Sequence, residues 1–267
     1  MRIPLVQHST RRRRARIRRV LFGGAELLVT AGMLVLLLVA HQLWWTNREA
    51  KEGAERRVEA LEREWEGDTG TGDAGTGAGE AGGAGGSGGG TAESGSDSGS
   101  ESGSGSGSVQ SGGAPASSAT YAILTVPRLG LRVPVAEGTG KQKVLNKGYV
   151  GHYPHTQQPG RTGNFALAGH RNTHGEPFRY LDRLKKGDTI TVETRSTRYT
   201  YTVDAVLPRT SPRDSGVIQP VPRSLTRPSY GYDAPGRYLT LTTCTPEYTS
   251  RYRLVVWGKL TAARPRG

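Results

Sequence analysis

Cysteine is almost absent from this chain, since Cys244 is the only one in 267 residues. A single thiol excludes an intramolecular disulfide. A lone cysteine is either a small buried hydrophobe or the nucleophile of a cysteine enzyme. The residue type alone favours the first interpretation, so the rest of the sequence has to decide.

Apolar side chains are nearly missing from residues 67–119, which are mainly Gly, Ser, Ala and Thr with a few acids. Such a composition cannot bury enough surface to offset the entropy of ordering, so we expect a disordered, flexible linker. Residues 120–262 are then the only segment able to build a core, and their number is ordinary for one domain.

Acidic residues are outnumbered, with 23 Asp and Glu against 36 Lys and Arg and a net charge of +13. The basic residues of the core-forming segment are scattered rather than gathered on one helix or interleaved with aromatics, so no nucleic-acid partner is expected. The one dense cluster, within residues 11–19, precedes a long apolar run.

That run, Val20 to Trp45, is long enough to cross a hydrocarbon core of ~30 Å at ~1.5 Å per residue. Arginines before it and few positive charges after it predict a cytoplasmic N-terminus and an extracellular remainder. A cleaved signal peptide is the alternative, but its apolar region would be shorter and end in small residues. The run instead ends in His41, Gln42 and two tryptophans, which favours an uncleaved signal anchor in the cell membrane.

After the anchor, Val58, Leu61 and Trp65 recur at helical spacing among Glu and Arg. We expect a short, mostly solvated helix there, with the linker acting as a tether. The predicted organisation is a basic cytoplasmic tail (1–19), a transmembrane signal anchor (20–45), a juxtamembrane helix (46–66), the linker (67–119), a catalytic domain (120–262) and a tail (263–267).

The domain is expected to be mainly β, because short runs rich in β-branched and aromatic residues alternate with Gly, Pro and Asn/Asp clusters. The runs lie at 121–127, 131–135, 164–170, 188–194, 198–206, 238–244 and 251–258. Residues 188–206 predict a hairpin that turns at 195–197, and Pro177–Leu184 predicts a short helix. This pattern is typical of a barrel or sandwich. The proline-rich segment Leu207–Tyr238 predicts a long, functional or disordered loop.

A cysteine nucleophile needs a base, and histidine is the natural partner. Of the histidines beyond the anchor, His170 ends a predicted strand, as Cys244 does. His152 and His155 form an H-x-x-H pair interrupted by proline, with no further ligand to complete a tetrahedral site, so no metal or cofactor is expected. Arg251 and Arg253 follow the cysteine and share one strand face, so alternation cannot choose between them as the oxyanion partner.

Three motifs in this order, A-L-A-G-H-R, T-L-T-T-C-T-P and R-L-V-V-W-G, resemble the sortase family. The G-N-F-A-L-A-G-H-R-x-T-x-G-x-P-F stretch and the N-terminal layout are most similar to class E sortases of high-GC Gram-positive bacteria. The resemblance covers roughly Tyr121 to Leu260. It implies an eight-stranded β-barrel, with one or two short helices, that acts as a cysteine transpeptidase.

By position, the resemblance implies that Cys244 is the nucleophile, His170 the general acid/base and Arg253 the substrate and oxyanion arginine; Arg251 fits less well. It implies that Leu207–Tyr238 roofs the substrate groove. Tyr153, Thr243 and His174 are the residues we expect to contact substrate. His155 stands where this family is expected to carry glycine, which puts the shape of its turn in question.

The implied reaction cleaves a sorting signal of L-P-x-T-G type, L-A-x-T-G in class E, between Thr and Gly. The implied partners are secreted proteins with a C-terminal sorting signal and an amine of the cell wall. One alternative is a pilin-polymerising sortase, although the Asp-Pro-Trp or Asp-Pro-Phe lid motif is missing between Trp65 and Tyr121. Another is a non-catalytic, tethered wall-binding module. The S-H-G-C motif of L,D-transpeptidases is also missing.

Overall fold

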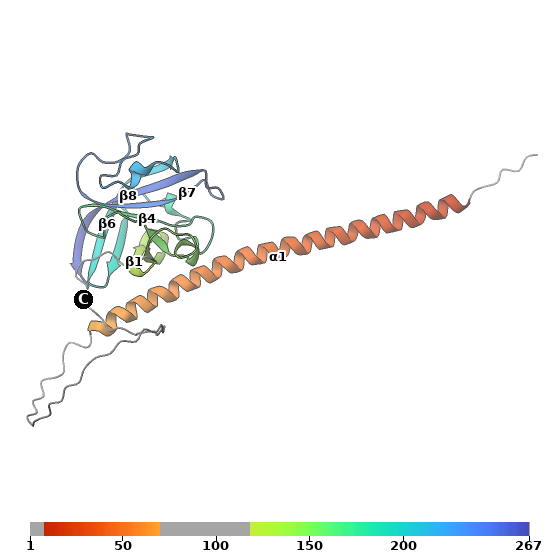
Figure 1. Cartoon of the computed structure of the whole chain (residues 1–267), viewed down its shortest axis with the longest axis horizontal. Coiled ribbons are helices and arrows are strands. Elements are labelled where there is room, and N and C mark those ends of the chain that lie inside the picture. The colour runs from red at the N-terminus through yellow and green to blue at the C-terminus, as the bar shows by residue number, and fades with distance from the viewer. Residues whose placement is uncertain (1–7, 70–117, 267) are drawn as a thin grey trace, which may run out of the picture.

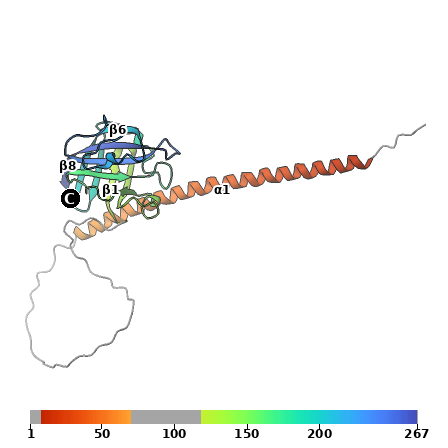
Figure 2. The ribbon, with the colours of Figure 1, turned by 45° about the horizontal axis from the view of Figure 1, so that its top comes forward.

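A closed β-barrel sits at one end of a long helix in the computed structural model, which describes residues 8–69 and 118–266 (Figures 1 and 2). The predicted linker at 67–119 lies almost entirely outside the described residues, and so do the first seven residues of the predicted cytoplasmic tail.

The eight strands of the barrel confirm the predicted mainly-β fold. They are β1 (Thr120–Val126), β2 (Leu131–Glu137), β3 (Val150–His152), β4 (Gly163–Ala168), β5 (Thr189–Thr194), β6 (Thr197–Thr210), β7 (Arg237–Thr245) and β8 (Tyr252–Pro265). Around the barrel the order is β1-β2-β3-β4-β7-β8-β6-β5, and β5 closes back onto β1. Inward-facing residues of all eight strands form one core cluster that includes Leu124, Phe165, Tyr201, Leu239 and Val256.

Local sequence accounts for most of these strands but not for all the details. The hairpin of β5 and β6 turns at residues 195–196, close to the predicted position. β3 has only three residues, too few for a periodic pattern, and it was not among the predicted runs. The predicted helix at Pro177–Leu184 buries Phe178, Leu181 and Leu184 as expected, but only Leu181–Arg183 is helical, as the 3-10 turn η3.

The other helical segments described in the barrel domain are also 3-10 turns: η1 (Pro127–Leu129), η2 (Leu145–Lys147) and η4 (Ser215–Ile218). Two strand pairs, β2 with β3 and β4 with β7, are parallel, and the rest are antiparallel. Parallel neighbours need a long connection. The chain between β2 and β3 carries the turn η2, and the chain between β4 and β7 carries η3, β5, β6 and η4.

Helix α1 (His8–Thr69) runs without a break through the predicted anchor and the predicted juxtamembrane helix. It contains a segment long and apolar enough to cross a membrane. The large apolar side chains of that segment, from Leu21 to Trp45, are exposed in the isolated chain. The segment is therefore a candidate for a membrane span.

The outer part of α1 is not the mostly solvated helix that its sequence predicted. Val58, Leu61 and Trp65 are buried against Ile123 of β1, and Ala54 joins the main barrel core. The thin apolar stripe is therefore covered by the chain's own barrel. The prediction failed because a periodic stripe shows that a helix has a buried face but does not show what covers it.

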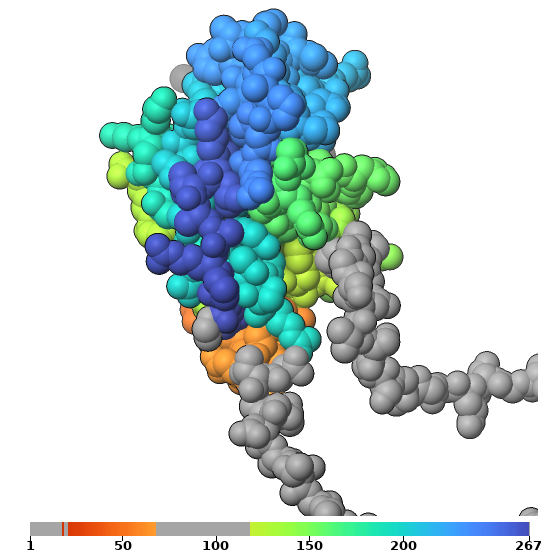
Figure 3. Space-filling view, turned by 90° about the vertical axis from the view of Figure 1, so that its left-hand side faces the viewer, coloured from red at the N-terminus to blue at the C-terminus, as the bar shows by residue number. Residues whose placement is uncertain are grey.

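Polar contacts flank this apolar seam on both sides. Arg57 donates to Thr120 Oγ1 at 2.5 Å, and Arg132 of β2 forms an ion pair with Glu62. At the far end, the Arg266 guanidinium lies 4.5 Å from the centre of the Trp65 ring, where the end of the helix meets the end of β8 (Figure 3). The barrel and the outer helix are thus joined along about three turns of the helix, from Ala54 to Trp65.

Val58→Asp is expected to detach residues 50–66 of α1 from the barrel, because an unpaired carboxylate in this seam would cost a few kcal/mol. Hydrogen exchange of the full chain in lipid nanodiscs should show faster exchange across this stretch while the core strands stay protected. Glu55→Ala, on the exposed face of the same helix, is the matched control. Equal protection in both variants would contradict the docked arrangement.

Candidate active site

Cys244 lies near the end of β7, directly opposite Arg253 of β8 in the antiparallel register. The thiol is half-buried and unpaired. The pairing of these two residues is a consequence of the tight connection after the cysteine, residues 246–251, which returns the chain alongside β7.

His170 reaches the same place from β4, which runs parallel to β7 on the cysteine's other side. The register pairs Ala168 with Thr242. His170 and Cys244, each two residues further along, therefore lie at the same height at the ends of these neighbouring strands. Neighbouring strands are ~4.8 Å apart. Two hydrogen bonds extend the pairing past the strand end: Gly169 N–H donates to the Thr242 carbonyl at 3.2 Å, and Thr243 Oγ1 donates to the Gly169 carbonyl at 2.8 Å.

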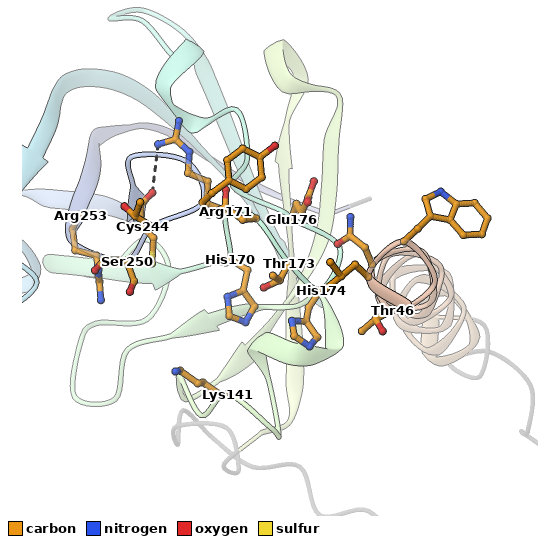
Figure 4. Close-up of a pocket in the computed structure, with 16 residues that line it drawn as sticks. Thr46, Lys141, His170, Arg171, Thr173, His174, Glu176, Cys244, Ser250 and Arg253 are labelled. Carbon is orange, nitrogen blue, oxygen red and sulfur yellow. Dashed lines mark hydrogen bonds between the residues drawn. The ribbon is translucent and has the colours of Figure 1, made fainter. Parts of the chain in front are cut away.

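A cavity of about 840 Å³ opens where these strand ends meet, and Cys244, His170, Arg253 and His174 all line it. In Figure 4, His170 lies between the side of the cavity that holds Cys244 and Arg253 and the side that holds His174. Thr46, at the near end of the helix seen end-on, lies beyond His174. The three residues predicted as a catalytic trio are therefore together in one cavity.

The environment of His170 strongly favours its neutral form. Burial, the neighbouring His174 and the charge of Lys141 together lower the pKa of His170 to about 4. The rings of His170 and His174 are stacked with centroids 5.3 Å apart. His170 Nε2 lies 2.9 Å from Asn146 Oδ1, so Nε2 carries the hydrogen and Nδ1 has the free lone pair.

Two residues that support this arrangement were not predicted. Asn146, on η2, orients the His170 ring through the hydrogen bond just described. Arg171 is buried; its guanidinium donates to the Cys244 carbonyl at 3.4 Å and to Thr245 Oγ1 at 3.1 Å, and it pairs with Asp182 at 3.2 Å. The only signal for Arg171 was its place directly after His170, and Asn146 had none.

The two arginines left open by the sequence occupy different environments. Arg253 lines the cavity, and its guanidinium donates to the carbonyls of Ser250 and Tyr252, both at 3.0 Å. Arg251 precedes β8, is exposed, and has its guanidinium 5.4 Å from the centre of the Tyr252 ring. Of the two, the geometry favours Arg253 as the partner of the cysteine.

The predicted substrate contacts fall in three different places. His174 lines the main cavity. Tyr153 lines a smaller adjoining cavity of about 180 Å³, which Arg253 also lines, and its hydroxyl is 3.0 Å from Thr242 Oγ1. Thr243 is buried, and its hydroxyl donates to the Gly169 carbonyl. Thr243 is not among the described residues that line either cavity. Its substrate contact stays a prediction.

In the turn that carries Tyr153, the unexpected histidine occupies a position whose backbone favours glycine. His155 is exposed and adopts a left-handed backbone with φ of 67°, a conformation that favours glycine.

His152, the other histidine of the H-x-x-H pair, is buried, with its Nδ1 2.7 Å from Glu137 Oε2 and 2.8 Å from the Tyr121 hydroxyl. Within the described part of the chain, no group of three His, Cys, Asp or Glu side chains is arranged to hold a metal ion.

The segment between β6 and β7, predicted as the roof of the groove, is ordered around a buried carboxylate. Asp214 accepts hydrogen bonds from Thr210, Ser224, Thr226 and the Leu225 N–H. Burial opposes ionisation of Asp214, but these bonds outweigh it and lower its pKa. Residues 211–215, 217 and 218 of this segment line the smaller cavity together with Tyr153.

Comparison with known families gives one match that covers more than half of the chain. The model of the sortase domain family matches residues 124–261. Sortase SrtE1 of Streptomyces coelicolor is 40% identical over 246 residues, which is 90% of this chain but 57% of that protein. Sortase SrtE2 of the same organism is 35% identical over 240 residues, covering 88% of this chain and 79% of the relative. The chain thus spans little more than half the length of the first relative.

Solved structures agree with the sequence comparison. The crystal structure of sortase E1 from Streptomyces coelicolor with a tripeptide in the active site is similar with a TM-score of 0.53 and 49% identity, over 57% of this chain and 94% of that one. Sortase E from Streptomyces avermitilis gives a TM-score of 0.50 and 41% identity, over 57% and 93%.

His174→Ala is expected to raise the pKa of His170 from about 4 toward 6.5, because it removes a neighbouring cation and part of the burial. NMR titration of the imidazole measures this shift, and His155→Ala, at an exposed site, is the control. In the unaltered chain, acidification from about pH 6.5 to 4 should favour unfolding, because the unfolded chain binds this proton first. A His170 midpoint that does not move in His174→Ala would contradict the assigned cause.

Proposed function

The chain belongs to the sortase family of cysteine transpeptidases, in its class E, and we propose that it cleaves a sorting signal and transfers the cleaved protein to an amine. The proposed signal is of L-P-x-T-G type, in its L-A-x-T-G form, cut between Thr and Gly. The proposed acceptor is an amine of the cell wall. The observation that carries the proposal is the meeting of Cys244, His170 and Arg253 in one cavity.

In the first half of the reaction, Cys244 Sγ attacks the threonyl carbonyl carbon. The thiol proton moves to His170, and the Arg253 guanidinium stabilises the oxyanion that forms. When the C–N bond breaks, the leaving glycine amine takes the proton from His170, and a thioester remains on Cys244.

In the second half, the acceptor amine attacks the thioester carbonyl and gives a proton to neutral His170. The C–S bond breaks, and the proton returns to the cysteine sulfur. His170 is suited to both halves because its resting form is neutral, its Nε2–H is held by Asn146, and its Nδ1 lone pair is free. A base with a pKa near 4 releases its proton readily to the leaving amine.

The smaller cavity supports a place for the signal residues that precede threonine. It is lined by Tyr153 and by residues of the β6–β7 segment, and it meets the main cavity at Arg253. A small residue such as alanine suits its size. The tripeptide in the active site of sortase E1 from Streptomyces coelicolor supports a peptide ligand for this chain too.

The proposed location is the cell membrane, with a single span, a cytoplasmic N-terminus and an extracellular barrel. The apolar segment of α1 and the arginines that precede it support this topology. A non-catalytic module would have no need to bring a thiol, an imidazole and a guanidinium to one cavity, and a pilin polymerase is disfavoured by the missing lid motif.

Cys244→Ala is expected to abolish cleavage of an L-A-x-T-G peptide while leaving the barrel folded, because the half-buried thiol contributes little to the core. Mass spectrometry of the full chain in nanodiscs, with peptide and candidate amines, should show the thioester and the transferred product only with the unaltered cysteine. Circular dichroism of the variant verifies its fold. Cleavage at an undiminished rate would refute the proposal.

Arg253→Ala is expected to lower kcat by roughly 10²–10³-fold, the cost of removing one oxyanion donor. Arg251→Ala removes the same charge nearby but no group at the cavity, and its kcat should stay within about twofold. Initial rates on the same peptide measure both. Similar losses in the two variants would show that charge alone, and not the position of Arg253, matters.

A further inference from the structure

One wall of the catalytic cavity comes from outside the barrel. Four residues of α1 at the outer end of the apolar segment line the same cavity as Cys244 and His170: Leu43, Trp44, Thr46 and Asn47. Thr46 is seen beyond His174 in Figure 4. The family match begins at residue 124, so this wall belongs to a part of the chain outside the matched domain.

The helix touches the barrel here through a specific hydrogen bond and a close backbone contact. Asn47 Oδ1 accepts from the Gly175 N–H at 2.7 Å. A Cβ on Gly148 would lie 2.6 Å from the Ala50 carbonyl oxygen, and one on Gly175 would lie 3.3 Å from the Lys51 nitrogen. Only glycine at position 148 allows the helix to approach this closely.

Gly175 lies in the middle of an unfavourable backbone segment. His174, Gly175 and Glu176 are left-handed in succession, with φ of 52°, 82° and 50°. Residues with a side chain rarely adopt this conformation, and such segments persist only where the surroundings hold them. One holder is the pair that Glu176 forms with Arg179, and another is the hydrogen bond from Gly175 to Asn47.

The held segment bears directly on the reacting groups. His174 stacks on His170 and lowers its pKa, so a shift of residues 174–176 changes the environment of the proposed acid/base. Two contacts thus join the end of the apolar helix to His170: Asn47 to Gly175, and His174 to His170.

We propose that Asn47 is a positioning residue for the reaction: its side chain holds residues 174–176 in place, so the membrane-side helix completes the catalytic cavity. This inference rests on the proposed transpeptidase function for its kinetic consequence, but not for its structural one. Asn47 itself acts through the loop and not on the substrate.

Asn47→Ala in the full chain, reconstituted in phosphatidylglycerol nanodiscs, is the test. Removing the acceptor is expected to speed hydrogen exchange of residues 172–176 about fivefold, in line with the net worth of one hydrogen bond. Cleavage of the L-A-x-T-G peptide should fall by a similar factor in kcat with KM little changed. Asn47→Asp keeps an acceptor oxygen and should restore both, and Glu55→Ala is the helix-surface control.

The outcomes test the positioning role of Asn47 separately from the proposed substrate. Unchanged exchange in Asn47→Ala, equal loosening in Asn47→Asp, a loosened loop with normal kcat, or a loss confined to KM would each overturn the positioning role. If the unaltered chain processes no such peptide, the proposed substrate is wrong, and the exchange measurements alone still show whether Asn47 holds the loop.

Discussion

The parallel pairing of β4 with β7 is the constraint on which the rest of the site depends. Six in-register residue pairs fix the level at which the two strands end, and that level places His170 beside Cys244. Antiparallel pairing of β7 with β8 then sets Arg253 opposite the cysteine. A slip of one residue in either register would turn a reacting side chain to the other face of the sheet. Backbone hydrogen bonds between strands therefore set the relative positions of Cys244, His170 and Arg253.

Around this sheet, buried polar groups fix the loops that the chemistry uses. Arg171 ties the end of β7 to Asp182, Asn146 orients His170, and Asp214 gathers the β6–β7 segment. Asp214 accepts hydrogen bonds from several donors, and the Arg171 guanidinium donates to two oxygens and pairs with Asp182, although its Nε has no hydrogen-bond partner within the described residues. Hydrogen-bonded polar groups of this kind make their surroundings rigid. The cavity is thus built from irregular backbone held at a few points.

Sequence predicted those features that depend on local pattern or on short motifs. The strands longer than a few residues, the apolar segment of α1 and the residues Cys244, His170 and Arg253 all carry such signals. Strand alternation in the sequence could not choose between Arg251 and Arg253; the structure separates them, because β8 begins at Tyr252 and its register sets Arg253 opposite Cys244. The hydroxyl of Thr243, a predicted substrate contact, donates to the Gly169 carbonyl, a hydrogen bond that the sequence did not indicate. The docking of Val58 and its neighbours, and the contact between Asn47 and Gly175, join segments far apart in the chain, and no local pattern contains their partners.

The docked helix also changes what the Gly- and Ser-rich segment does. Both of the described stretches that flank residues 70–117 are held on one body: Trp65 contacts Ile123 and Arg266, and the Ser118 N–H donates to the Glu137 carbonyl at 2.8 Å. Because the chain on both sides of this segment is attached to the same barrel, the segment does not connect two separate folded parts. Its length therefore does not set how far the cavity stands from the apolar end of α1. That distance is fixed by a continuous helix rising ~1.5 Å per residue, so the insertion or deletion of helical residues between 47 and 58, and not of glycines after 69, would rotate and displace the catalytic cavity.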